Sequence, residues 1–191
     1  MHYFTADLHL DHTNIIIYCN RPFGLGPDIK DSISRTKATE LMNDTIINNI
    51  NQTVKENDTL WVLGDFAFAH SPEHLRSLRN RIVCRNITAI RGNHDKSWYS
   101  QVLGAMKDMD SIEIGGNRIV LCHYPMLSWN ASFHGSWHLF GHCHGNMNPW
   151  LSQHLTETRM LDIGVDCHNF KPLSFEEIRD YMLARPAKHL S

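Results

Sequence analysis

Five short apolar runs in this chain each end in acidic, amide or histidine side chains. The runs cover residues 3–5, 59–63, 87–90, 118–121 and 137–140, and their length and content are typical of buried β-strands. The side chains that follow them, here called the ligand set, are Asp7, His9, Asp65, Asn93, His123, His142 and His144. A single aspartate or histidine of this kind is commonly a turn former, a helix cap or a core residue. Five such junctions in one chain instead predict that several strand ends meet at one polar site.

Helical patterns alternate with these strands early in the chain, and strands cluster later. We expect helices over residues 14–18, 32–53, 72–80, 96–103 and 175–183, a β-hairpin over 110–121 and a further strand at 160–164. In the longest helix, the spacing of Ile33, Leu41, Ile46, Ile47 and Ile50 predicts an apolar stripe. This order predicts one α/β domain over residues 1–191, with helices packed on mixed sheets and a loose tail from residue 185. In such folds ligands bind beyond the carboxyl ends of the strands.

Charge and composition exclude several classes of protein. The formal net charge is −2 and no run of Lys or Arg is present, so a basic surface for nucleic acid is not expected. The chain contains no apolar stretch of membrane-spanning length and does not begin with a signal-peptide pattern. Its five cysteines are an odd number without a C-x-x-C pair, which favours reduced thiols. We therefore expect a cytoplasmic protein that has no membrane partner.

The chemistry of the ligand set indicates two metal ions. Seven carboxylate, amide and imidazole groups exceed the four ligands of one tetrahedral zinc site, whereas they suit two divalent ions that share one carboxylate. Asp65 is alone in its loop and is therefore the expected bridging ligand. Two such ions about 3.5–4 Å apart form a clamp for in-line displacement at phosphorus, with a bridging hydroxide as the nucleophile.

The same residues form an ordered series of motifs. The patterns D-x-H, G-D, G-N-H-D, a lone histidine and G-H-x-H occur in that order between residues 7 and 144. In this the chain resembles the calcineurin-like metallophosphoesterases. Residues 14–16, 19–23 and 137–142 are similar to those of short prokaryotic or phage-type members. The resemblance implies a four-layer α/β/β/α sandwich with two mixed sheets.

The resemblance also implies a role for each matching residue. The first metal would bind Asp7, His9, Asp65 and His144, and the second would bind Asp65, Asn93, His123 and His142. His94 would face the substrate and either contact the phosphate or protonate the leaving oxygen, while Asp95 would hold the other ring nitrogen of His94.

Four more polar residues are candidates on position alone. Arg21 lies in a loop expected to overhang the metals, where a guanidinium suits a phosphate group, although a surface position is as consistent with the sequence. His12 either touches substrate or begins a surface helix. Asp162 and Asp166 are candidate acceptors for the outer nitrogens of metal-binding histidines.

These observations predict a metal-dependent phosphoric ester hydrolase, with a phosphodiesterase favoured. The alternatives are a phosphomonoesterase or nuclease of the same family, or a non-catalytic metal-binding scaffold. The expected partner is a phosphate-ester substrate, for which a nucleotide is one candidate. Manganese is the expected metal, and Fe, Zn, Ni, Co and Mg also suit these ligands.

Overall fold

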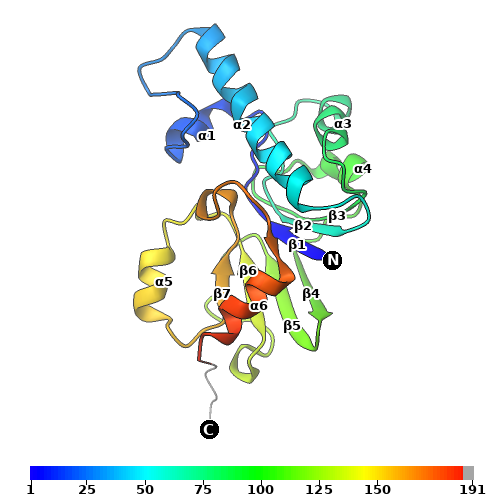
Figure 1. Cartoon of the computed structure of the whole chain (residues 1–191), viewed down its shortest axis with the longest axis vertical. Helices are drawn as coiled ribbons and strands as arrows, with labels where there is room; N and C mark the ends of the chain where they lie inside the picture. The colour runs from blue at the N-terminus through cyan, green and yellow to red at the C-terminus, as the bar shows by residue number, and fades with distance from the viewer. Residues whose placement is uncertain (187–191) are drawn as a thin grey trace.

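Two four-stranded mixed β-sheets form the centre of the computed structural model, which describes residues 1–186 (Figure 1). Of the loose tail predicted from residue 185, Arg185 instead donates a hydrogen bond to Thr158 O at 3.0 Å, and residues 187–191 lie outside the described residues. The first sheet has the order β3-β2-β1-β8, with β1 (His2–Thr5), β2 (Thr59–Leu63), β3 (Asn86–Ile90) and β8 (Leu173–Ser174). The second has the order β4-β5-β6-β7, with β4 (Met109–Ile114), β5 (Asn117–Cys122), β6 (Trp137–Phe140) and β7 (Met160–Asp162). In each sheet three strands are parallel, and β8 or β4 is the antiparallel edge strand.

Three of the six α-helices within residues 1–186 begin at a capping side chain. The six helices are α1 (Thr13–Tyr18), α2 (Ser32–Thr53), α3 (Pro72–Asn80), α4 (Ser100–Leu103), α5 (Asn148–His154) and α6 (Phe175–Leu183), with 3-10 turns η1 (Ser97–Tyr99), η2 (Ser132–His134) and η3 (Val165–Cys167). The side chains of Asp31, Ser71 and Ser174 accept hydrogen bonds from the first turns of α2, α3 and α6. Each of these bonds satisfies a backbone N–H that has no partner inside its helix.

Three apolar clusters separate the layers. Ile16, Met42, Ile46 and Leu75 of helices α1 to α3 pack in a cluster with Leu60 of the first sheet. The cluster between the sheets contains Phe4, Leu63, Leu121 and Trp137, and α6 contributes Phe175, Ile178 and Met182 to it. On the outer face of the second sheet, Leu151 of α5 packs with Val120 and Phe140. The predicted α/β/β/α arrangement with two mixed sheets is therefore confirmed.

The predicted stripe on α2 is partly wrong. Ile33 and Leu41 are 68% and 53% exposed. The predicted Ile46, Ile47 and Ile50 are buried, and Ala38 and Met42 lie on the buried face in place of Ile33 and Leu41. Figure 1 shows the first turns of α2, which include Ile33, standing clear of both sheets. Two elements, α5 and β8, were not predicted, and the expected helix at 96–103 is divided into η1 and α4.

The carboxyl ends of the parallel strands meet between the two sheets. Beyond β1, Asp7 N donates to Gly64 O at 3.1 Å, and His9 N donates to Asp65 O at 2.9 Å. Val165 N, beyond β7, donates to Ala6 O at 3.1 Å and so joins the second sheet to the first. These bonds bring together the loops that carry the ligand set.

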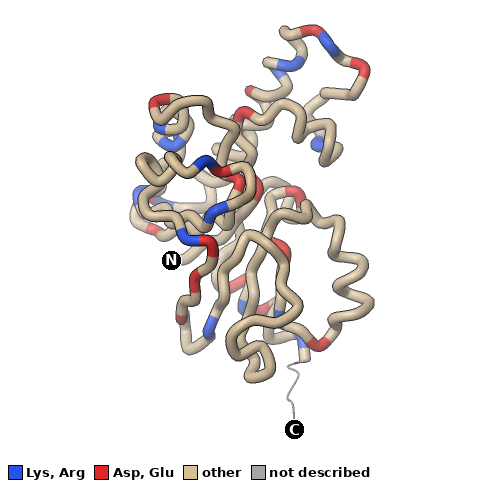
Figure 2. Tube along the Cα trace, turned by 180° about the vertical axis from the view of Figure 1, so that it is seen from behind, with Lys and Arg blue, Asp and Glu red and all other residues tan. Residues whose placement is uncertain are grey.

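Figure 2 shows no stripe of Lys and Arg alone or of Asp and Glu alone. Among residues 1–186, no helix is long and apolar enough to cross a membrane.

Candidate metal centre

The ligand set converges on one site from both sheets. Asp65 Oδ2 lies 3.4 Å from His9 Nε2 and 3.5 Å from His123 Nε2. Asn93 Oδ1 lies 2.9 Å from His123 Nε2 and 3.0 Å from His142 Nδ1. One ligand atom each of Asp7, His9 and His144 lies within 4.8 Å of the others, and the same holds for Asp7, Asp65 and His123. All seven predicted residues are thus linked in one constellation.

Five members of the ligand set have left-handed backbone conformations. Their φ angles are 57° for Asp7, 50° for His9, 55° for Asp65, 70° for His142 and 48° for His144. Such values are uncommon outside glycine and cost free energy, so they persist only where surrounding contacts impose them. The loops are therefore held in unfavourable conformations that aim these side chains into the site.

Two glycines allow the loops to approach one another. A Cβ atom on Gly92 would lie 2.2 Å from Asp65 Oδ1, and one on Gly64 would lie 2.3 Å from His123 Nδ1. Gly64 also has a φ of +89°, which disfavours any other residue. The glycines of the G-D and G-N-H-D motifs are therefore required by close packing between neighbouring ligand loops.

Asp95 does not have its expected role. Its Oδ2 accepts hydrogen bonds from Asp65 N at 2.9 Å and Gly92 N at 2.8 Å, and its Oδ1 accepts one from Phe66 N at 3.0 Å. Within residues 1–186 no hydrogen bond joins Asp95 to the His94 ring. The prediction that Asp95 sets the tautomer of His94 is corrected, because backbone amides occupy its carboxylate. Asp95 instead fastens the loop after β3 to the loop after β2.

Arg21 is also not where the phosphate hypothesis put it. Its side chain is 0% exposed, and it forms a two-point ion pair with Asp166, with both N···O distances 2.8 Å. The remaining guanidinium contacts go to Asp7 O at 2.8 Å, Leu8 O at 3.1 Å and the sulfur of Met42. These contacts use all five donors of the group, so none remains for a substrate. Arg21 is therefore a buried support of the first ligand loop.

The support extends to His144. Asp166 Oδ2 lies 2.7 Å from His144 Nδ1, as the sequence hypothesis for Asp166 anticipated. The carboxylate of Asp162, in contrast, accepts hydrogen bonds from the backbone amides of Gly145 and Gly164 at 3.0 and 2.9 Å. Among the described residues, no histidine ring is hydrogen-bonded to this carboxylate. The chain Arg21–Asp166–His144 fixes the ring orientation of a candidate ligand through its outer nitrogen.

His94 and His12 line the exposed side of the site. The rings of both residues lie 5.3 Å from the His9 ring and 5.8 Å from each other. The His12 ring also stacks on Phe68, with centroids 4.7 Å apart and planes at 16°. His12 therefore belongs to the mouth of the site, in line with the substrate-facing alternative for this residue.

Burial and neighbouring charges perturb the ionisation of the site. Burial raises the pKa of Asp7 to about 7 and lowers the pKa of His9 to about 2. Burial alone would raise the pKa of Asp65, but the hydrogen bond with His123 and the neighbouring histidines lower this pKa to about 2. Burial likewise opposes protonation of His144, but the hydrogen bond with Asp166 raises the pKa of His144 to about 10.

The residues fit divalent cations. His9 Nε2 is buried and lacks a hydrogen-bond partner, which is a costly state for an imidazole nitrogen. A cation beside it would accept its lone pair and favour the ionised form of Asp7. Carboxylate, imidazole and amide oxygen donors suit Mn, Fe, Zn and related ions.

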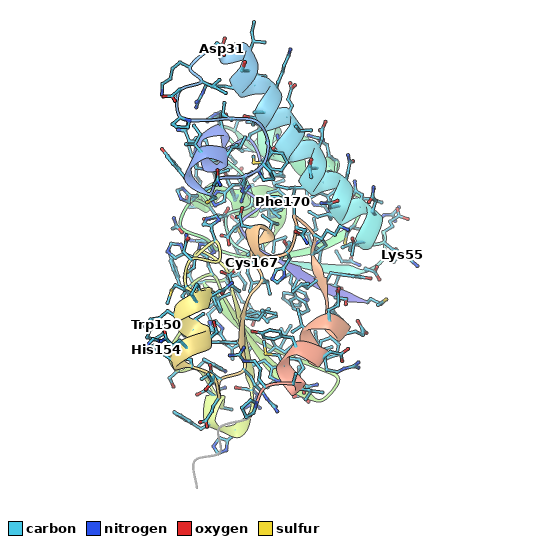
Figure 3. All side chains as sticks on the ribbon, turned by 60° about the vertical axis from the view of Figure 1, so that its left-hand side comes forward. Asp31, Lys55, Trp150, His154, Cys167 and Phe170 are labelled. Atoms are coloured by element: carbon cyan, nitrogen blue, oxygen red, sulfur yellow. The ribbon has the colours of Figure 1, made fainter. Side chains whose placement is uncertain are left out.

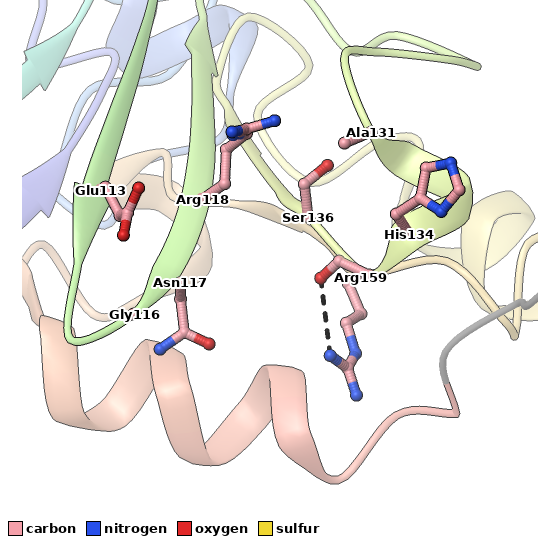
Figure 4. Close-up of a pocket in the computed structure, with 9 residues that line it drawn as sticks. Glu113, Gly116, Asn117, Arg118, Ala131, His134, Ser136 and Arg159 are labelled. Carbon is pink, nitrogen blue, oxygen red and sulfur yellow. Dashed lines mark hydrogen bonds between the residues drawn. The ribbon is translucent and has the colours of Figure 1, made fainter.

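A second, polar pocket lies far from this centre along the strands. It is lined by Arg118, Arg159, His134 and Glu113, among others (Figure 4). Its residues precede or begin β5, β6 and β7, whereas the ligand set follows the opposite ends of β5 and β6. This pocket is therefore not part of the metal centre.

Two mixed sheets between helical layers, with a His/Asp/Asn ligand set at the joined strand ends, define a metallophosphoesterase-type fold and site. Residues 42–159 match the profile of the calcineurin-like phosphoesterase superfamily domain, and the chain belongs to this superfamily. An uncharacterized protein of Methanocaldococcus jannaschii is 31% identical over 179 residues, which cover 92% of this chain and 88% of that protein. The crystal structure of a protein of unknown function from Aquifex aeolicus is similar, with a TM-score of 0.69 and 25% identity, covering 95% of this chain and 98% of that chain.

Proposed function

We propose that the protein is a phosphodiesterase that requires two divalent metal ions. The observation that carries this proposal is the position of Asp65. One of its carboxylate oxygens lies 3.4–3.5 Å from a histidine nitrogen on either side, and each histidine belongs to a different group of candidate ligands. A carboxylate between two groups of donors is suited to bridge two ions. The first ion would also be held by Asp7, His9 and His144. The second ion would also be held by Asn93, His123 and His142.

Two ions in such a site lower the pKa of a shared water and neutralise the phosphoryl oxygens of the substrate. The chain's own contribution begins with Asp65, Asp95 and Gly92, whose mutual contacts keep the ligand loops at a fixed separation. His94 is exposed beside His9 and is the group we assign to the leaving oxygen, to which it donates a proton as the ester bond breaks. His12 lies on the same side and is assigned to hold the substrate.

One feature favours a diester over a monoester, and a second concerns the leaving group. The mouth of the site is open, since His94, Asn93 and His142 are all exposed, and a second ester group would find room there. An alkoxide leaving group also needs a proton more than a phenolate does, which gives His94 a function. Manganese is the proposed metal because the carboxylate and amide oxygens are hard ligands. A cytoplasmic location is proposed because all five cysteines are free.

The test is hydrolysis of bis-p-nitrophenyl phosphate and p-nitrophenyl phosphate by metal-stripped protein resupplied with Mn²⁺. We expect manganese-dependent turnover with a higher kcat/KM for the diester. Asp65→Asn should abolish turnover, whereas Asp44→Asn, at an exposed position on α2, should leave it unchanged.

A higher kcat/KM for the monoester would replace the phosphodiesterase by a phosphomonoesterase. Turnover that is independent of metal, or that persists in Asp65→Asn, would refute the proposed mechanism. No turnover by protein that binds two ions would favour the non-catalytic scaffold.

A further inference from the structure

An apolar hollow lies beside the metal centre, between the loop after β5 and helix α5. Its volume is about 480 Å³, within the range of small-molecule sites. The side chains that give it its character are Met126, Leu127, Met147, Trp150 and Met160. Three methionines make an adaptable surface that accepts flexible apolar groups.

This part of the chain also lacks formal charge. Residues 119–156 contain no Lys, Arg, Asp or Glu, although one residue in five of the whole chain is charged. Leu127 and Trp150 are nevertheless 73% and 44% exposed. In Figure 2 the segment around α5 is tan, the colour of residues other than Lys, Arg, Asp and Glu. Figure 3 shows Trp150 and His154 on that helix. A gathering of exposed apolar side chains without charges indicates a surface that binds an uncharged apolar group.

The hollow is continuous with the ligand loops. Pro125 and Asn146, which line it, follow His123 and His144 by two residues each. Tyr124 precedes Pro125 in the chain and borders the metal centre, where its ring lies 5.0 Å from the His123 ring and 4.8 Å from the His142 ring. A molecule whose phosphate is at the metal centre can therefore extend past Tyr124 into the hollow.

We infer that the hollow binds the apolar ester group of the substrate, which is a phosphate ester of a long-chain alcohol. This inference rests on the proposed phosphoesterase function and specifies its substrate class. The occupant must be uncharged because no charged side chain lines the hollow. A nucleotide does not match this requirement, because its sugar and base would leave polar groups unpaired against methionine and leucine side chains.

The test is a series of p-nitrophenyl alkyl phosphates in which the alkyl group is methyl, butyl or octyl. All three release the same p-nitrophenolate, so differences in kcat/KM report binding of the alkyl group. Complete burial of a methylene corresponds to a gain of roughly fourfold, and we expect octyl to exceed methyl by at least about tenfold after partial burial. A flat series from an enzyme that hydrolyses all three esters would overturn the inference and leave the proposed function intact.

A matched pair of variants locates the effect. Leu127→Glu puts a charge in the hollow, and Ile33→Glu makes the same change at a similarly exposed isoleucine on α2. Leu127→Glu should reduce the octyl-to-methyl ratio to below about twofold, because the charge removes the favourable burial of the octyl group. Ile33→Glu should keep the wild-type ratio. An unchanged ratio in Leu127→Glu would contradict the inference.

A binding measurement keeps the inference testable if the protein does not hydrolyse these esters. Calorimetric titration with octyl phosphate and methyl phosphate should show tighter binding of the octyl compound, with a more negative heat-capacity change, in wild type and in Ile33→Glu. Equal binding of both compounds would refute the hollow as a site. A wild-type dimer that Leu127→Glu converts to a monomer would likewise refute it, because a second copy would then cover the hollow.

Discussion

Replacement of Arg21 by lysine separates a structural role from a substrate-binding role for this residue. Arg21 makes five donor contacts while its side chain is fully buried, including the two-point ion pair with Asp166. Lysine keeps the charge but has three donors that cannot form the planar two-point pair. At least two contacts are therefore lost, at about 1.5–3 kcal/mol for each hydrogen bond to a charged group.

We expect Arg21→Lys to lower the free energy of unfolding of the metal-free protein by about 3 kcal/mol, the low end of the range for a broken buried pair. Asp166 also orients His144, so the metal dissociation constant should rise about 10- to 100-fold. Urea unfolding followed by circular dichroism gives the first quantity, and competition with a chelator gives the second.

The control is Arg79→Lys on α3. Arg79 donates to the carbonyls of Ile82, Cys84 and Arg85, away from the site, and its loss should reduce stability without changing metal affinity. If Arg21→Lys unfolded within about 0.5 kcal/mol of wild type and only raised KM, the burial argument would be wrong. Arg21 would then be the phosphate ligand that its loop position indicated.

Three further substitutions test the roles of His94, Gly92 and His138. His94→Ala should retain both metal ions and lose about 10²- to 10⁴-fold in kcat for phenyl esters. The loss should be far smaller for nitrophenyl esters, because only the poor leaving group needs a proton. Equal losses for both esters would show that His94 is not the acid. Gly92→Ala should weaken metal binding in a calorimetric titration, because its Cβ would lie 2.2 Å from Asp65 Oδ1, and wild-type affinity would contradict the tight loop contact. Burial lowers the pKa of His138 from 6.5 to about 4, so the unfolded chain binds a proton first as pH falls below 6.5. Metal-free wild type should therefore lose about 2.5 kcal/mol more stability than His138→Gln between pH 7 and pH 4.5 in urea unfolding, whereas equal losses would refute the buried neutral imidazole.

Five of the strands and the ligand set were predictable because local sequence determines them. In β1, β2, β3, β5 and β6 a short apolar run is followed within a few residues by a candidate ligand, and β2 and β6 have the predicted bounds. The helices α3 and α6 likewise begin at the serines that the sequence marks as caps. The order of the motifs then predicted which side chains would meet, and the structure brings all seven together.

The supporting contacts were not predictable in the same way. Arg21 and Asp166 are separated by 145 positions, and no local pattern indicates that a loop arginine turns inward to meet a distant aspartate. The partners of Asp95 are backbone amides, which every residue except proline possesses and which therefore leave no trace in the sequence. Helix α5 was missed because it has only seven residues, although proline in its first turn is a typical start signal.

The number of metal ions bound per chain decides whether the site holds a dinuclear centre bridged by Asp65. Metal-stripped protein is dialysed against Mn²⁺, and bound manganese is measured by elemental analysis for wild type and Asp65→Asn. We predict two ions per wild-type chain and at most one in the variant, because Asp65 Oδ2 lies 3.4 Å from His9 Nε2 and 3.5 Å from His123 Nε2 and is the proposed bridge between the ions. One ion or none in wild type, or two ions retained by Asp65→Asn, would contradict a dinuclear centre bridged by this carboxylate.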